Sequence, residues 1–259
     1  MGRRLQELLA QNKLTRVFAV GQLCDPKIIE ILGMEGGYDA VWLDNEHAGL
    51  TIAQIEHATR AARGAGLETF VRLAPTDYAT VMRQLEAGAG GIMAAQVRNT
   101  REAENVVRWS KFHPQGLRGF NGSGVDGRYG TMRPKEYTEK ANAETFIAIQ
   151  IEHVEALNEV EQIAAIPHVD VLFIGPADLG QSMGILGEWN NPKIWQAIER
   201  VAKAAREHGI HWAILPTDAD FSRRCVDLGC RMLSLGLDTW VVQRGIRAFK
   251  KEFASHFEV

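Results

Sequence analysis

The sequence is poor in cysteine, has no strong excess of either charge, and lacks a long hydrophobic run. Its three cysteines, Cys24, Cys225 and Cys230, are odd in number and form no Cys-x-x-Cys pair, which argues against a disulfide framework or a zinc knuckle. A net charge of −3 leaves no basic surface for nucleic acid or an acidic membrane. No apolar run could span a bilayer, and residues 1–10 do not resemble a secretory signal. We therefore expect a cytoplasmic protein with neither nucleic-acid nor membrane partners.

Lysine is missing from the segments that are expected to be strands. A Schiff-base aldolase needs a buried strand lysine whose amine loses its charge and attacks a ketone. Every lysine here falls in an expected loop or helix, so an enolate would have to be stabilised by a metal and a cation such as Arg72. The last two expected strands also lack a glycine-rich phosphate cradle, which disfavours a phosphosugar isomerase.

Short β-rich apolar runs alternate with longer segments of helical period along the chain. The expected strands lie near 17–22, 40–45, 69–73, 91–97, 146–152, 170–175, 211–216 and 232–237. Regular alternation without a Pro/Ser-rich linker predicts a single (β/α)8 TIM barrel that spans residues 1–259, with a doubly wound sheet as the alternative. Between Lys111 and Tyr137 frequent glycines break the rhythm, which predicts a long, mobile loop over the active face.

Polar residues directly follow several of these expected strands. Asp44, Asn45, Glu46 and His47 follow the second strand, and Arg72 ends the third. Burying a polar or charged group without a partner costs several kcal/mol, so these residues must have either a structural or a functional reason to be there. One explanation is a set of helix caps and satisfied side chains. The other is an active site, because barrel enzymes keep their chemistry at the carboxyl ends of the strands.

Two carboxylates, Glu152 and Asp178, follow the fifth and sixth expected strands, which are neighbours in a barrel. Two hard oxygen ligands with open positions suit Mg²⁺ or Mn²⁺. A glycosidase carboxylate pair is a weaker alternative, because the chain is expected to lack the aromatic platforms that bind a sugar. Successive strand residues face opposite sides, so His153 is expected to point away from the site that Glu152 faces.

Six short motifs occur in register at 43–48, 71–72, 114–119, 150–152, 173–179 and 236–238. Together they resemble the HpcH/HpaI family of class II, pyruvate-dependent aldolases. The resemblance extends over nearly the whole chain. It implies a metal-dependent carbon–carbon lyase that uses Mg²⁺, Mn²⁺ or Co²⁺ to enolise pyruvate, or a close 2-oxoacid such as hydroxypyruvate. The enolate would add to an aldehyde, and the reverse reaction would cleave a 4-hydroxy-2-oxoacid.

The resemblance also implies roles for individual residues. Glu152 and Asp178 match the metal ligands, and Asp44 matches a residue that holds a metal-bound water. Arg72 matches the contact to the pyruvate oxygen and the aldehyde, and His47 matches the catalytic acid/base. The remaining matches, which orient the substrate, are Gln150 and the backbone of Gly175, Pro176 and Ala177.

Three positions depart from the family pattern. Glu86 stands where relatives commonly carry the aspartate that pairs with the catalytic histidine, and we assign it this role here. Ala95 replaces a proline of the fourth strand. Gly21 and Gln22 stand where some relatives place a bulky aromatic residue, so Gln22 is expected to contact the acceptor and to favour small hydroxylated aldehydes.

Two other functions remain open for this sequence. A CoA-ester lyase of the citrate lyase β-subunit type shares the barrel, the arginine and the acidic ligands, although the motif at 44–47 disfavours it. A non-catalytic barrel that acts as a binding protein is the second alternative, which the intact polar residues make less favourable.

The C-terminal helix expected over 239–257 carries a single apolar stripe. The stripe consists of Val242, Ile246, Phe249, Phe253 and Phe257. It either closes the chain's own barrel or packs on a neighbouring subunit. The resemblance implies the second arrangement, in a homohexamer built as a trimer of dimers.

Overall fold

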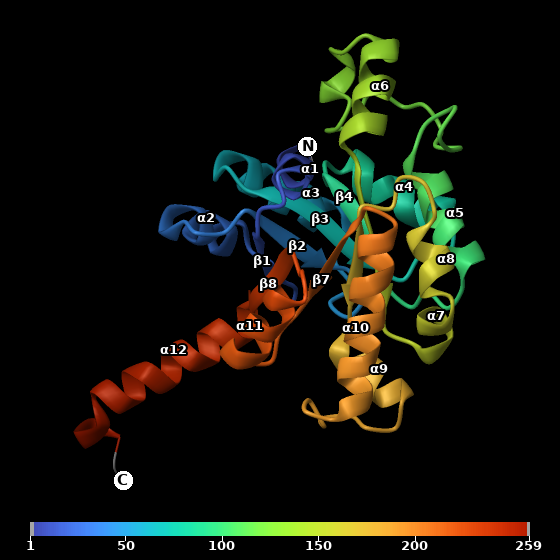
Figure 1. Ribbon diagram of the computed structural model, residues 1–259. Coiled ribbons are helices and arrows are strands. Elements are labelled where there is room, and N and C mark those ends of the chain that lie inside the picture. Colours follow the sequence, from blue (N-terminus) through green and yellow to red (C-terminus); the bar gives the residue numbers. More distant parts are fainter. Residues whose placement is uncertain (1–2, 258–259) are drawn as a thin grey trace.

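The computed structural model of the protein describes residues 3–257. Its parallel strands close into a barrel in sequence order, from β1 to β8 and back to β1 (Figure 1). The strands are β1 (Thr15–Val20), β2 (Ala40–Asp44), β3 (Glu68–Leu73), β4 (Gly91–Ala94), β5 (Phe146–Ile151), β6 (Val171–Ile174), β7 (His211–Ile214) and β8 (Met232–Leu237). The predicted (β/α)8 barrel is therefore confirmed.

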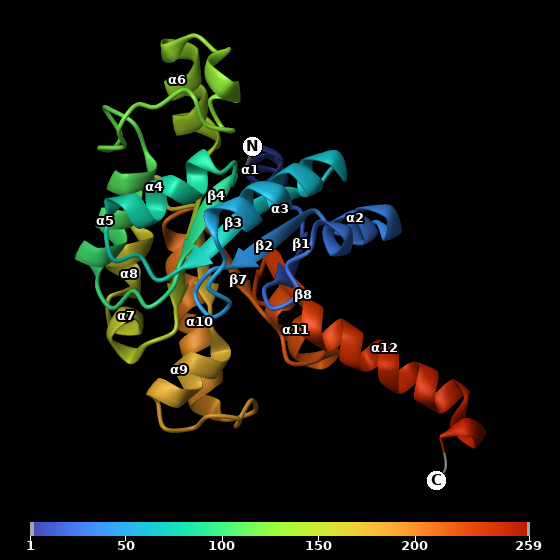
Figure 2. The ribbon, with the colours of Figure 1, turned by 180° about the vertical axis from the view of Figure 1, so that it is seen from behind.

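Helices alternate with the strands and cover the outside of the barrel (Figures 1 and 2). They are α1 (Arg3–Ala10), α2 (Pro26–Glu35), α3 (Ile52–Gly64), α4 (Tyr78–Glu86), α5 (Thr100–Ser110), α6 (Pro134–Glu144), α7 (Val154–Asn158), α8 (Val160–Ala164), α9 (Pro176–Ser182), α10 (Pro192–Glu207), α11 (Ala219–Asp227) and α12 (Asp238–Glu252). Between residues 3 and 257, no helix is long and apolar enough to cross a membrane.

Two apolar layers hold the barrel together. The inner layer consists of side chains that alternate inward along the strands, such as Phe70, Met93 and Phe146, all fully buried. Leu5 and Leu9 of α1 pack against this layer and are also buried. The outer layer lies between strands and helices, where helical residues three and four apart face the sheet.

The segment between Lys111 and Tyr137 does not cover the active face. It follows α5 and leads through α6 into β5, so it lies at the amino ends of the strands, whereas α9 follows β6 at the carboxyl ends. Figure 1 shows α6 and α9 at opposite ends of the molecule. The segment is tied down there, because Val125 donates its peptide N–H to the Glu86 carbonyl at 3.0 Å. The glycine content correctly predicted an irregular segment. The segment connects a helix to the next strand, however, so it lies at the end of the barrel opposite the active face.

Helix α12 extends away from the barrel over most of its length (Figures 1 and 2). Its apolar stripe is exposed to solvent in this chain, with Ile246 at 55% and Phe249 at 63% of their full surface. The stripe therefore does not close the chain's own barrel.

Candidate active site

The polar residues at the barrel mouth continue the inward alternation of the strands. On β2, buried Trp42 is followed two residues later by Asp44, and on β3, Phe70 is followed by Arg72. Asp44 and Arg72 are direct neighbours in the register of the two strands. Because alternate residues of a strand face the same side, the inward face that forms the core of each strand continues into the site at the strand's carboxyl end.

Arg72 is held by acidic and aromatic partners. Its Nε and Nη2 donate to the two carboxylate oxygens of Asp44 at 3.1 and 2.7 Å. Its Nε lies 3.4 Å from Glu46 Oε2, and its guanidinium lies 4.7 Å from the ring centre of Trp42. Burial acts to raise the pKa of Asp44, but Arg72 and the peptide N–H groups of His47 and Glu46 hold that pKa below its usual value. The result is a fixed ion pair with a cation at the barrel mouth.

Glu152 is fully buried at the end of β5. Its Oε1 accepts the peptide N–H of Gln96 at 2.6 Å, and its Oε2 accepts from Gln150. Burial raises the pKa of Glu152 to about 7, and the negative charges of Glu46 and Asp178 contribute to the rise, against the lowering effect of Gln96 and Arg72. A carboxyl group with so high a pKa, near other acids, is a candidate for function.

Gln96 connects two acidic residues of the site, Glu152 and Glu46, and was not identified from the sequence. Besides its peptide N–H bond to Glu152, its Nε2 donates to Glu46 Oε1 at 3.0 Å. Its Oε1 lies 2.9 Å from Nε2 of His153, so this histidine reaches the edge of the site after all. Gln96 adopts a left-handed backbone conformation with φ of 60°, which is uncommon for a residue other than glycine. Strained residues of this kind occur often at functional sites.

Asp178 and the residues before it form the β6 side of the site. Gly175, Pro176, Ala177 and Asp178 all line a cavity of about 260 Å³ at the barrel mouth, together with Trp42, Arg72, Met93, Gln150, Phe173, Ile174, Trp189, Leu215, Thr217 and Trp240. A side chain at Gly175 would collide with Gln150 and Glu152, because its Cβ would lie 2.7 Å from Gln150 Nε2. Three tryptophans, Trp42, Trp189 and Trp240, also line the cavity, so the expectation that aromatic platforms are missing was wrong.

His47 lies at the rim of the site, with 60% of its side chain exposed. Its Nε2 is 3.7 Å from Glu46 Oε2, so Glu46 is the carboxylate beside it in this chain. Glu86 does not approach His47 here, because it ends α4 near the amino ends of the strands. There its Oε2 accepts a hydrogen bond from Asn121 at 3.1 Å.

Gln22 does not line the 260 Å³ cavity. The buried carboxylate of Asp238 accepts the peptide N–H groups of Gly21 and Leu23 at 2.7 and 2.8 Å, and this fixes the loop between them. The side chain of Gln22 is exposed and borders a separate hollow beside α2. The structure therefore brings together all of the sequence-predicted site residues except Gln22 and Glu86.

The residues at the mouth fit a hard divalent cation. Within residues 3–257, no group of three or more His, Cys, Asp and Glu side chains forms a complete metal cage. Mg²⁺ does not need one, since it usually keeps several waters and binds one or two carboxylates. Buried Glu152 has Asp178 nearby, and the buried Oε1 of Gln150 has no hydrogen-bond partner. A cation would relieve the acidic repulsion and use oxygen donors that are already present.

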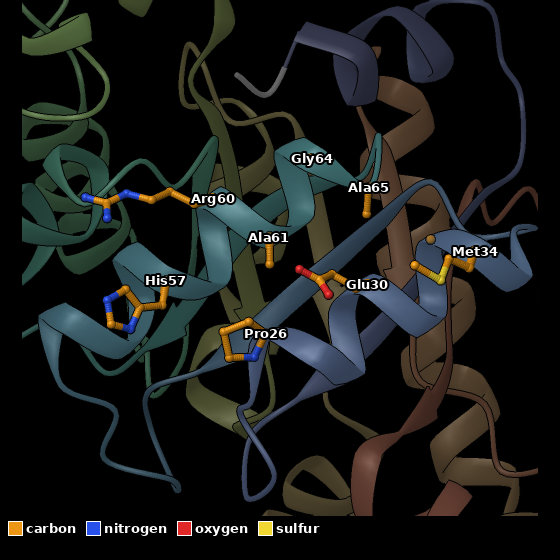
Figure 3. A pocket seen from close by; sticks show the side chains of 9 residues that line it. Pro26, Glu30, Met34, His57, Arg60, Ala61, Gly64 and Ala65 are labelled. Carbon is orange, nitrogen blue, oxygen red and sulfur yellow. The ribbon is translucent and has the colours of Figure 1, made fainter.

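A larger hollow, of about 660 Å³, lies on the outside of the barrel between α2 and α3 (Figure 3). It is lined by Pro26, Glu30, Gly33, Met34, His57, Arg60, Ala61, Gly64 and Ala65. Arg60 in this hollow is paired with Glu56 of the same helix at 2.9 Å. The hollow shares no lining residue with the cavity at the barrel mouth, and its polar side chains do not converge as those at the mouth do.

Known proteins resemble this chain over most of its length. A model of the HpcH/HpaI aldolase/citrate lyase family matches residues 17–244. A hydroxypyruvate/pyruvate aldolase of Paraburkholderia phytofirmans is 34% identical, over 85% of this chain and 86% of that protein. A 4-hydroxy-2-oxo-heptane-1,7-dioate aldolase of Escherichia coli is 30% identical, over 85% of this chain and 83% of that protein.

The fold agrees with these sequence relationships. The crystal structure of an HpcH/HpaI aldolase from Desulfitobacterium hafniense matches 95% of this chain with a TM-score of 0.88 and 31% identity, and 96% of that chain is covered. The motifs at the strand ends, the barrel and these matches all point the same way, and the chain belongs to the HpcH/HpaI aldolase/citrate lyase family.

Proposed function

We propose that the protein is a class II, divalent-metal-dependent aldolase. It reversibly cleaves 4-hydroxy-2-oxoacids into pyruvate, or a close 2-oxoacid such as hydroxypyruvate, and an aldehyde. The observation that carries this proposal is the buried carboxyl of Glu152, which shares the barrel mouth with Asp178 and with the Asp44–Arg72 ion pair. Negative ligands for a metal and a fixed cation for a substrate oxygen thus lie together at the barrel mouth.

Cleavage requires one proton to leave the substrate and another to return. The C4 hydroxyl loses its proton, the C3–C4 bond breaks, and its electron pair passes to C3 as the aldehyde departs. A proton delivered to C3 then gives the methyl group of pyruvate. His47 is assigned this exchange, because its exposed ring at the rim can reach the substrate through water.

Arg72 and Gln150 hold the 2-oxoacid in place for this step. Arg72 is oriented by Asp44 and Trp42, so its remaining N–H groups can bind a substrate oxygen that gains negative charge. Gln150 lines the same cavity, and its Nε2 is used by Glu152, which leaves Oε1 for a ligand or substrate. The peptide groups from Gly175 to Ala177 orient the substrate carboxylate at the start of α9.

Glu152 and Asp178 are the proposed metal ligands, and we assign Asp44 to hold a water in the same site. A bound Mg²⁺, Mn²⁺ or Co²⁺ would supply positive charge beside the keto and carboxylate oxygens of the 2-oxoacid. All three ions accept carboxylate oxygens.

The test is to supply the metal-loaded protein with pyruvate or hydroxypyruvate and a panel of aldehydes, and to detect new 4-hydroxy-2-oxoacids by NMR. Chelator-treated protein should form none until metal is restored. Turnover at the full rate in metal-free protein would exclude the class II mechanism. The same samples incubated with a CoA ester test the citrate lyase alternative, and the absence of product in every reaction would favour a non-catalytic binding barrel.

An oligomer is also part of the proposal. Phe249 on α12 and Phe253 at its C-cap are 63% and 47% exposed, which is unfavourable for a helix that extends into water. Burial against a second copy would remove this surface, and a homohexamer built from dimers is the assembly we expect. Because Glu86 and His47 lie at opposite ends of one barrel, the predicted pair between them requires two copies.

A further inference from the structure

The cavity at the barrel mouth has two unlike parts. Arg72, Gln150 and Asp178 provide polar groups from β3, β5 and α9. Trp189, Leu215 and Trp240 provide apolar surface from the α9–α10 loop, the end of β7 and the first turn of α12. Under the proposed function the 2-oxoacid occupies the polar part. The apolar part therefore faces the second reactant, the aldehyde.

Trp189 and Trp240 do not contribute to the packing of the core. Neither belongs to the two apolar core clusters within residues 3–257, and Trp240 is 40% exposed. In the same range, neither indole takes part in an aromatic pair or a cation–π contact. Large apolar side chains left uncovered around a cavity are typical of a ligand-binding surface.

Within one copy, the charges around the cavity do not favour a second acid group on the aldehyde. Among the described lining residues, Arg72 is the only lysine or arginine, and it is paired with Asp44 and assigned to the 2-oxoacid. Thr217 is the one hydroxyl of the lining in that range. A carboxylate or several hydroxyls on the aldehyde would thus lose water without gaining partners. An aromatic ring would instead stack on the indoles.

We propose that Trp189, Leu215 and Trp240 form the acceptor subsite and that it selects uncharged aromatic aldehydes. This assignment rests on the proposed aldolase function, and it names residues other than Gln22, to which the sequence pointed. In the synthetic direction, C3 of the 2-oxoacid loses a proton and bonds to the aldehyde carbon, whose oxygen takes up a proton. The atoms balance without a further reactant, and the product is a 4-hydroxy-2-oxoacid that carries a ring on C4.

The experiment compares kcat/KM for benzaldehyde, glyceraldehyde and succinic semialdehyde with saturating pyruvate. The native enzyme should prefer benzaldehyde. Trp240→Ala and Trp189→Ala should each reduce that preference, within the range of about 10- to 200-fold that an apolar pocket provides, and Trp240→Phe should retain most of it. The matched control is Trp109→Ala on α5, where a partly buried indole borders a different hollow. Because the preference is a ratio between acceptors, partial loss of active protein does not change it.

Deuterium exchange into the methyl group of pyruvate, without any aldehyde, separates the two levels of the proposal. Exchange together with a preference for glyceraldehyde or succinic semialdehyde overturns the acceptor assignment and leaves the aldolase function standing. An unchanged ratio in both tryptophan-to-alanine variants overturns it as well. Absence of both exchange and adducts in metal-loaded native protein overturns the two together.

Discussion

Replacing Gly175 with alanine should damage the metal site without breaking the barrel. The backbone at Gly175 has φ of −93°, which alanine can adopt, so the effect arises from the added methyl group alone. That Cβ would lie 2.7 Å from Gln150 Nε2, 2.9 Å from Glu152 Oε2 and 3.0 Å from Glu152 Cβ. These distances are well inside van der Waals contact, so both side chains must retreat from their positions.

The size of the effect follows from that displacement. A shift approaching 1 Å in a positioned catalytic group costs about 100-fold in rate, or about 2.7 kcal/mol. We expect Gly175→Ala to lower kcat/KM by roughly this factor and to weaken metal binding measured without substrate. Crowding in the core also costs about 1–3 kcal/mol of stability, so urea unfolding is measured in parallel to separate the two effects.

Gly180→Ala, five residues further along in α9, provides the matched control. Its Cβ would meet the Ile185 carbonyl oxygen at 3.5 Å, which is ordinary contact. This variant should keep native metal affinity, measured by calorimetry or by the paramagnetic signal of Mn²⁺, and native kcat/KM. If Gly175→Ala matched Gly180→Ala in both quantities, then Glu152 and Gln150 would not form the site that the geometry assigns to them.

Three further outcomes test the metal site and the assembly. Glu152→Ala and Asp178→Ala should abolish turnover and calorimetric metal binding while circular dichroism stays native, and retained metal affinity in both would contradict the ligand assignment. In metal-free protein the pKa of Glu152 is raised from 4.5 to about 7, so this carboxyl contributes stability that is complete below about pH 4.5 and is lost as the pH rises through 7. The free energy of unfolding should fall by an amount on the order of 3 kcal/mol over this pH range in the native protein and should not fall in Glu152→Gln. Equal pH dependence of urea unfolding in the two proteins would refute the raised pKa. Light scattering should find an oligomer for the native chain and smaller species for Phe249→Asp with Phe253→Asp, whereas a native monomer of 28.7 kDa would rule out the proposed interface.

The fold could be predicted because the barrel repeats one simple pattern. The apolar runs predicted the bounds of each strand to within a few residues. Helical segments between successive strands are compatible with only a few topologies. The same alternation located Asp44, Arg72 and Glu152, since each continues the inward face of its strand by two residues. For these residues, the local sequence determines where the side chain points.

Residues placed by loop geometry could not be found in this way. Gln96 acts through a peptide N–H and a left-handed backbone conformation, and neither has a sequence pattern. Trp189 lies in an irregular loop, and Trp240 reads as part of an amphipathic helix. Gln22 was misjudged for a related reason, because its loop is shaped by Asp238 at the far end of the sequence.

Trp240 links the acceptor subsite to the surface that we expect to form the oligomer. It lies in the first turn of α12, while Phe249 in the last turn and Phe253 at the C-cap lie in the part of the helix that extends away from the barrel. If a second copy holds α12 in place, then freeing the helix should disturb Trp240 before it disturbs Glu152 or Arg72, which are fixed by β5 and β3. Dissociated protein should therefore lose preference between aldehydes while it still exchanges the methyl protons of pyruvate. Parallel loss of both activities on dissociation would instead mean that the second copy supports the 2-oxoacid half of the site.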